Sequence, residues 1–129
     1  MKRSIFLLIT AAFAALFGGM MFFLPATVIE EFGTEPTLFS TFLMREMGLV
    51  ILCSSVMNFL VRNDSDSNAL KAILIFNMVY HLAMIPIVFM GVSQGIFTIY
   101  KAIPGLAAHL FIGVGSLIYL RNIKTSAPL

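Results

Sequence analysis

Four stretches of mostly apolar residues constrain this chain more than any other feature. They cover approximately residues 5–24, 38–61, 69–90 and 102–120. A helix needs about 20 residues to cross the ~30 Å hydrocarbon core of a bilayer. Pro25, Pro36, the polar run 63–68 and Pro104 separate the stretches or stand at their ends. The pattern predicts an all-α fold, an integral membrane four-helix bundle that forms a single domain over residues 1–129.

Composition excludes the main soluble classes. Hydrophobic residues make up 60% of the chain and charged residues only 11%, against about 25% charged in a typical globular domain. The net charge of +2 comes from scattered Lys and Arg, so we expect the bilayer as a partner and no nucleic acid. The single cysteine, Cys53, excludes an internal disulfide and a cysteine-cluster metal site.

The distribution of Lys and Arg predicts an orientation. Lys2 and Arg3 could begin a signal peptide cleaved near residues 12–14, but the apolar run continues to Leu24, beyond a signal core of about 7–15 residues, so we expect it to be retained. Lys101 is alone on one side of a four-span topology. Six basic residues share the other side: Lys2, Arg3, Arg62, Lys71, Arg121 and Lys124. Both termini are therefore predicted to be cytoplasmic, in a multi-pass protein of the inner membrane if the source is a bacterium.

Four ionisable residues lie within the predicted spans: Arg45, Glu46, His81 and His109. Each costs about 2.5–3.5 kcal/mol at the centre of a membrane helix, so each needs a structural or functional reason. Counting from the span centres places all four in the half of the bundle away from the termini. The two histidines fall within about 3 Å of the same depth.

Neighbouring small and polar residues extend this candidate site. Asn77 shares a helix face with His81, and Gly105 and Gly113 flank His109 four residues away on either side. Small residues allow another helix or a flat ligand to approach the imidazole. We therefore expect Asn77, Gly105 and Gly113 to contribute to a ligand-binding surface.

Three chemistries use the same residues. His81 and His109 could hold a haem iron from both sides, without covalent attachment because Cys-x-x-Cys-His is absent. Glu46 with the two histidines would make a two-His, one-carboxylate metal site. Alternatively, the cluster binds a quinone or an isoprenoid, with Arg45 orienting a carbonyl or anionic group and Glu46, His81 and His109 as acid–base groups.

Two other function classes remain open at this point. The polar cluster could only hold helices together in a non-catalytic membrane partner subunit, since histidines often join membrane helices by hydrogen bonds. An oligomeric channel or transporter is the further alternative, although small multidrug exporters carry a glutamate in the first helix and residues 5–24 have no ionisable group. These residues do not distinguish an enzyme from a binding protein, or a homo-oligomer from a complex with a partner subunit.

The segment Phe42–Leu49 contains Arg45 and Gly48 and resembles the Arg-x-x-Gly element at the start of the second helix in DoxX-like membrane proteins. Pro25 and the Phe32-Gly33 pair after the first span are also similar, as are chain length and layout. The resemblance implies a small bacterial four-helix protein, some of whose relatives are linked to quinone or thiol redox systems. The wider superfamily is similar to sterol isomerase-type bundles, where acidic groups and histidines act on isoprenoid rings. His81 and His109 match no motif of the family.

Overall fold

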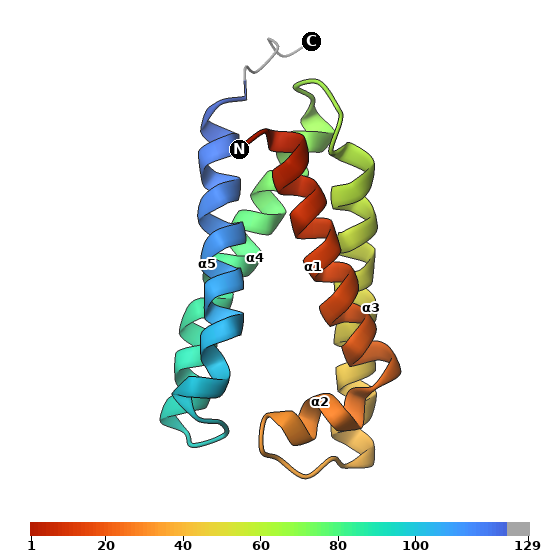
Figure 1. Ribbon diagram of the computed structural model, residues 1–129, viewed down its shortest axis with the longest axis vertical. Coiled ribbons are helices and arrows are strands. Elements are labelled where there is room, and N and C mark those ends of the chain that lie inside the picture. The colour runs from red at the N-terminus through yellow and green to blue at the C-terminus, as the bar shows by residue number, and fades with distance from the viewer. Residues whose placement is uncertain (124–129) are drawn as a thin grey trace.

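The computed structural model describes residues 1–123, and within them it contains helices and turns but no strand. The helices are α1 (Arg3–Phe23), α2 (Pro25–Glu31), α3 (Leu38–Val61), α4 (Asn68–Ser93) and α5 (Ile99–Arg121) (Figure 1). Four of them, 21 to 26 residues long, are long and apolar enough to cross a membrane. The predicted all-α bundle of four membrane helices is confirmed. Lys124, used for the orientation, lies outside the described residues.

Two helix boundaries differ from the expectation. The last helix begins at Ile99 rather than at about residue 102, because Thr98 takes the extended N-cap conformation and Pro104 is accommodated inside the helix. The connection between the first and second spans also contains the short helix α2, which Pro25 opens at its first position. Proline favours that position, since its fixed φ suits a helix start and its missing N–H has no partner to lose there.

The four long helices form two hairpin-like pairs, α1 with α3 and α4 with α5 (Figure 1). Glycines set the crossing of α1 and α3. A Cβ on Gly48 would lie 2.6 Å from the Phe22 nitrogen and 2.8 Å from the Gly18 carbonyl oxygen. The Ser55 hydroxyl also donates to the Ala11 carbonyl at 2.7 Å. Close backbone contact through small residues is a common way for membrane helices to associate.

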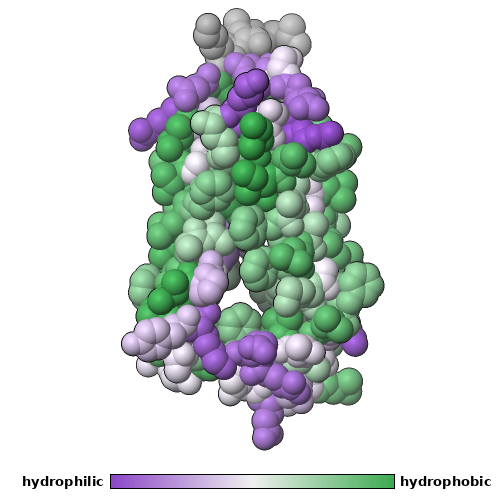
Figure 2. Space-filling model, viewed as in Figure 1, coloured by the Kyte–Doolittle hydropathy of each residue, from purple (hydrophilic) through white to green (hydrophobic). Residues whose placement is uncertain are grey.

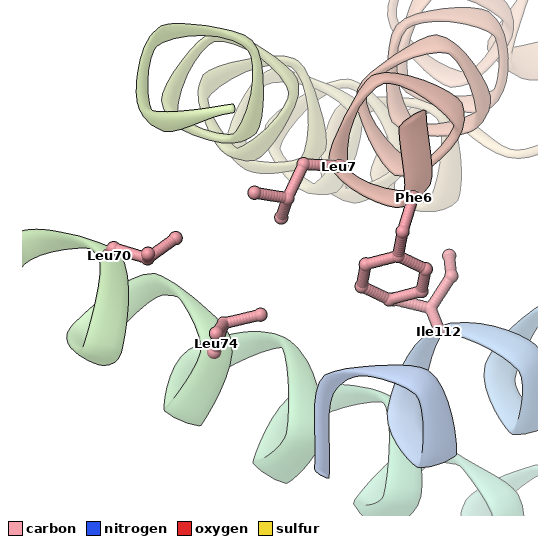
Figure 3. Close-up of a cluster of buried hydrophobic side chains, with 5 residues drawn as sticks. All are labelled: Phe6, Leu7, Leu70, Leu74 and Ile112. Carbon is pink, nitrogen blue, oxygen red and sulfur yellow. The ribbon is translucent and has the colours of Figure 1, made fainter. Parts of the chain in front are cut away.

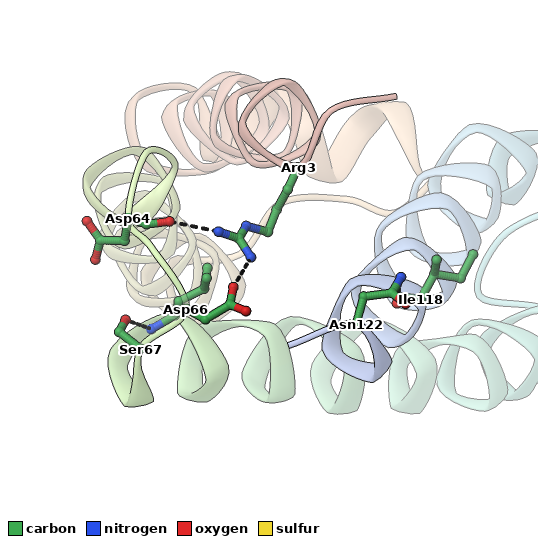
Figure 4. Close-up of polar contacts among 7 residues, drawn as sticks. Arg3, Asp64, Asp66, Ser67, Ile118 and Asn122 are labelled. Atoms are coloured by element: carbon green, nitrogen blue, oxygen red, sulfur yellow. Dashed lines mark hydrogen bonds and ion pairs between the residues drawn. The ribbon is translucent and has the colours of Figure 1, made fainter. Parts of the chain in front are cut away.

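The two pairs meet at the end that holds the termini, which we call the terminal end. Five buried side chains form the core there: Phe6, Leu7, Leu70, Leu74 and Ile112 (Figure 3). Arg3 also ties the N-terminus to the α3–α4 loop, through an ion pair of 2.6 Å with Asp66 and a hydrogen bond of 2.7 Å to the Asp64 carbonyl (Figure 4).

The pairs diverge toward the opposite end, which we call the α2 end (Figure 1). The space-filling view shows an opening between them at this level (Figure 2). The α2 end is bridged by Phe32, whose ring centroid lies 5.5 Å from that of Phe97 in the α4–α5 loop. The Lys101 amine approaches the same bridge, 3.6 Å from the place a Cβ on Gly33 would take. The opening is therefore bounded by the core at one end and by α2 at the other.

Candidate functional site

The two membrane histidines are in direct contact. Nδ1 of His81 on α4 lies 2.8 Å from Nδ1 of His109 on α5, and their ring centroids are 5.1 Å apart. The ring of Tyr80 is steeply inclined to both imidazole rings, by 87° to His81 and 70° to His109. Its centroid lies 5.1 Å from that of His81 and 6.4 Å from that of His109. The expectation that the histidines share one depth is confirmed.

The neighbours of the histidine pair indicate the side of α4 on which it lies. Asn77 lies one turn from His81 on the same face of α4. Its amide exchanges two hydrogen bonds with Asn58 of α3, at 2.7 and 3.3 Å. That face of α4 therefore looks toward the α1–α3 pair. His81 lies one turn closer to the α2 end, where the pairs diverge, and both histidines are only half-buried.

The contact between the rings fixes their hydrogen-bonding chemistry. One Nδ1 must carry a hydrogen and the other must accept it, since two bare nitrogens would repel each other. In the neutral pair, the donor ring then has a bare Nε2 and the acceptor ring has an Nε2–H. Neither Nε2 has a partner among residues 1–123, and neither is sealed from its surroundings. The pair thus offers one acceptor and one donor to a bound molecule.

Asn77, expected to bind a ligand, has its side chain engaged elsewhere. Asn58 and Asn77 are both fully buried, and Asn58 also donates to the Ser54 carbonyl at 2.9 Å. This amide pair joins α3 to α4. Asn58 was not among the expected site residues, although an amide inside an apolar span is itself a signal of an interhelical contact.

Arg45 and Glu46 do not join the histidines. Asn58 marks the side of α3 that faces α4, and a helix turns by ~100° per residue, so Arg45 and Glu46 point about 140° and 120° away from it on either side. Both are exposed, and neither makes a hydrogen bond or ion pair with a described residue. The expected cluster of four ionisable groups therefore divides: α3 is rotated so that its small residues meet α1 and its charges face outward.

The two glycines expected beside His109 have different environments. A Cβ on Gly113 would lie 2.8 Å from Cδ2 of Leu82, so this glycine lets α5 approach α4 closely. A Cβ on Gly105 would meet nothing within 4 Å. Gly113 therefore serves helix contact, and Gly105 leaves free space one turn from His109 toward the α2 end.

The Nδ1 contact is too short for a haem iron between these two atoms, and the expected three-residue metal site is not assembled. A haem iron held between the two imidazoles needs about 2 Å to each nitrogen and therefore about 4 Å between them, whereas the Nδ1 atoms lie only 2.8 Å apart. In the part of the chain that the structure describes, no three His, Cys, Asp or Glu side chains are grouped to hold a metal ion. The site of Glu46, His81 and His109 is therefore not assembled, because Glu46 faces away.

Two surface hollows lie away from these residues. One, of about 310 Å³, is at the terminal end. The other, of about 270 Å³, is an apolar groove between α1 and α3. The first is lined by Arg3, Ser4, Arg62, Asn63 and Asp64, and the second by Leu8, Ala11, Ala12, Ala15, Ser55, Val56 and Phe59. Neither hollow is lined by a candidate residue.

The fold and this site define a class: a small multi-pass all-α membrane protein with a histidine–histidine contact between two of its helices. No protein-family model, no curated protein and no solved structure matches the chain. The resemblance to DoxX-like proteins therefore stays a prediction, carried by Arg45 and Gly48. In this structure Gly48 has a packing role, at the crossing with α1.

Proposed function

We propose that this protein binds an apolar small molecule that enters from the bilayer between its two helix pairs. His81 and His109 hydrogen-bond a carbonyl or hydroxyl group of that molecule. Quinones and isoprenoid alcohols have this chemistry, a long apolar body with one or two polar oxygens. The observation that carries the proposal is the 2.8 Å histidine contact, which leaves one Nε2 acceptor and one Nε2–H donor without partners among residues 1–123.

The surroundings of the pair support a ligand of this class. The opening lies between helices whose exposed side chains are mostly apolar (Figure 2). Pockets for small molecules are typically apolar with a few placed polar groups that fix orientation. Gly105 leaves space beside His109. The resemblance to DoxX-like proteins implies the same ligand class.

The pair would also let a proton pass without a net change in the charge of the protein, while the two rings exchange their tautomers. A proton taken up at the bare Nε2 of one ring makes its Nδ1–H more acidic. That hydrogen then moves across the 2.8 Å contact, and the second ring releases its own Nε2–H. Such a relay would give the histidines an acid–base role toward a bound hydroxyl or carbonyl group. We place it in the outer half of an inner-membrane protein with cytoplasmic termini.

The test compares two double variants that each remove one interhelical polar pair. His81→Leu/His109→Leu deletes the proposed site, whereas Asn58→Leu/Asn77→Leu deletes the buried amide pair. Each protein is purified in nanodiscs, its bound lipids are extracted for mass spectrometry, and the binding of decylubiquinone and of farnesol is measured by calorimetry. We expect binding by the wild type and by the asparagine variant, and a loss of at least about tenfold in affinity, equal to ~1.4 kcal/mol, in the histidine variant.

One competing function has an observation in its favour. The short histidine contact also ties α4 to α5, as a purely structural hydrogen bond in a non-catalytic partner subunit would. In that case the histidine variant loses thermal stability, and neither probe binds to any of the three proteins. Flux of ions through liposomes containing the wild type would instead favour the channel alternative.

A further inference from the structure

The charged pair of α3 lies in an unfavourable place for an isolated protein. Arg45 is about 7 Å from the middle of α3, well inside a hydrocarbon layer of ~30 Å. Apolar side chains are exposed on both sides of it: Leu38 (90%) and Phe39 (71%) toward the α2 end, and Val50 (59%) toward the terminal end. The charges therefore lie within the apolar belt rather than at its edge, and a partner for them would remove a large cost.

The exposed face around the charges has the spacing of a coiled-coil seam. Steps of four and three residues connect a single line of exposed residues along α3: Phe42, Glu46, Leu49, Cys53, Val56 and Leu60. This is the alternation of a and d positions in a heptad repeat, with Glu46, Cys53 and Leu60 at a. Exposed apolar residues alone indicate nothing in a bilayer, since lipid covers them equally well. Glu46 in the seam and Arg45 directly beside it distinguish this face.

Arg45 and Glu46 of one chain are complementary in charge to Glu46 and Arg45 of a second copy. From these observations we propose that a second copy of this chain packs against the outer face of α3 in a parallel, two-fold symmetric dimer. Both copies insert with the same orientation, so their α3 helices run parallel and each residue meets its partner at the same depth. A side chain at position a packs among four residues of the facing helix, one of which immediately precedes the facing a residue. Glu46 of each copy thereby meets Arg45 of the other, which gives two reciprocal ion pairs.

This interface is independent of the proposed ligand site. Asn58 lies on the face of α3 that contacts α4, the helix that carries His81, whereas the seam lies on the opposite face of α3. Loss of ligand binding and loss of dimerisation are therefore separate results.

The chain carries its own probe for this interface. Cys53 is the single cysteine, it is exposed, and it lies at an a position seven residues after Glu46. Facing a positions approach each other across a parallel pair, which brings the two thiols within reach of a disulfide. Oxidation with copper phenanthroline in native membranes should give a species of twice the 14.2 kDa chain mass.

Charge exchange tests the ion pairs themselves. Arg45→Glu or Glu46→Arg alone places like charges opposite each other and should lower the rate of cross-linking about 5- to 30-fold. The double exchange Arg45→Glu/Glu46→Arg restores the reciprocal pairing and should restore the rate. As a control for random collision, Cys53→Ala/Val114→Cys moves the thiol to a similar depth on the exposed face of α5 and should not cross-link.

Each contrary result overturns the proposal. Equal cross-linking of the Val114 control shows collision rather than an interface. Equal rates in the single and double charge variants show that Arg45 and Glu46 do not pair between copies, as when Arg45 reaches a lipid phosphate. A wild type that gives no cross-link and has a monomeric mass when released from nanodiscs in native mass spectrometry shows that no dimer exists, without any variant.

Discussion

The crossing of α1 and α3 allows a quantitative test through Gly48. An alanine there would place its Cβ 2.6 Å from the Phe22 nitrogen and 2.8 Å from the Gly18 oxygen, both backbone atoms. Ordinary carbon contacts lie at 3.4–4 Å, so the helices would have to separate by about 1 Å. Backbone cannot move aside as a flexible side chain does, and overpacking of this kind typically costs about 1–3 kcal/mol.

A neighbouring glycine supplies the matched control. A Cβ on Gly19 would meet nothing within 4 Å, yet Gly19→Ala makes the same change in helix propensity, worth up to about 1 kcal/mol in water. The difference in stability between Gly48→Ala and Gly19→Ala therefore isolates the overpacking. We expect Gly48→Ala to be less stable than Gly19→Ala by about 1–3 kcal/mol.

The measurement is reversible unfolding in mixed micelles with increasing sodium dodecyl sulfate, followed by circular dichroism. Gly18→Ala should resemble Gly48→Ala. The double variant should lose less than the sum of both, because the two substitutions open the same contact. A difference below about 0.5 kcal/mol between Gly48→Ala and Gly19→Ala would refute the close crossing.

Two further predictions use the same titration. Asn77→Leu should destabilise the protein by about 1–3 kcal/mol because it leaves the fully buried Asn58 amide without its partner. The second change, Asn58→Leu, should recover part of that loss. Strictly additive losses in the double variant would contradict the pairing. The hydroxyl of Ser116 is buried and has no hydrogen-bond partner in the described part of the chain, so Ser116→Ala should be neutral or stabilising by up to about 1 kcal/mol. A loss above that value would show that the hydroxyl has a partner.

Span length and depth could be predicted from the sequence because both depend on counting residues along one axis. The second span, 38–61, coincides with α3. The common depth of His81 and His109 follows from their distance to the span centres, and the 2.8 Å contact bears it out. The short helix α2 was missed because seven residues between a proline and an acidic turn form no apolar period.

The rotation of each helix about its own axis was harder to predict from the sequence than its length and depth. Depth alone placed Arg45 and Glu46 with the histidines, but the structure turns them to the opposite side of α3. Gly48 and Asn58 contained the missing information, since each marks a face that must meet another helix. A comparison of their positions around the helix axis with those of Arg45 and Glu46 could have shown that the two charges do not lie on the inner face of α3.

In a bilayer this rotation has to be specified by small and polar residues. In water, an apolar stripe identifies the buried face, but a membrane helix is apolar on all sides and lipid solvates any face equally well. On α3, Gly48 and Ser55 fit only against α1, and Asn58 finds its amide partner only on α4. Turning α3 by one residue, about 100°, would bring Arg45 toward α1 in one direction or Glu46 toward α4 in the other, and would break the contacts with both helices. The same few residues that position α3 therefore also determine that Arg45 and Glu46 face outward, where a second copy can pair with them.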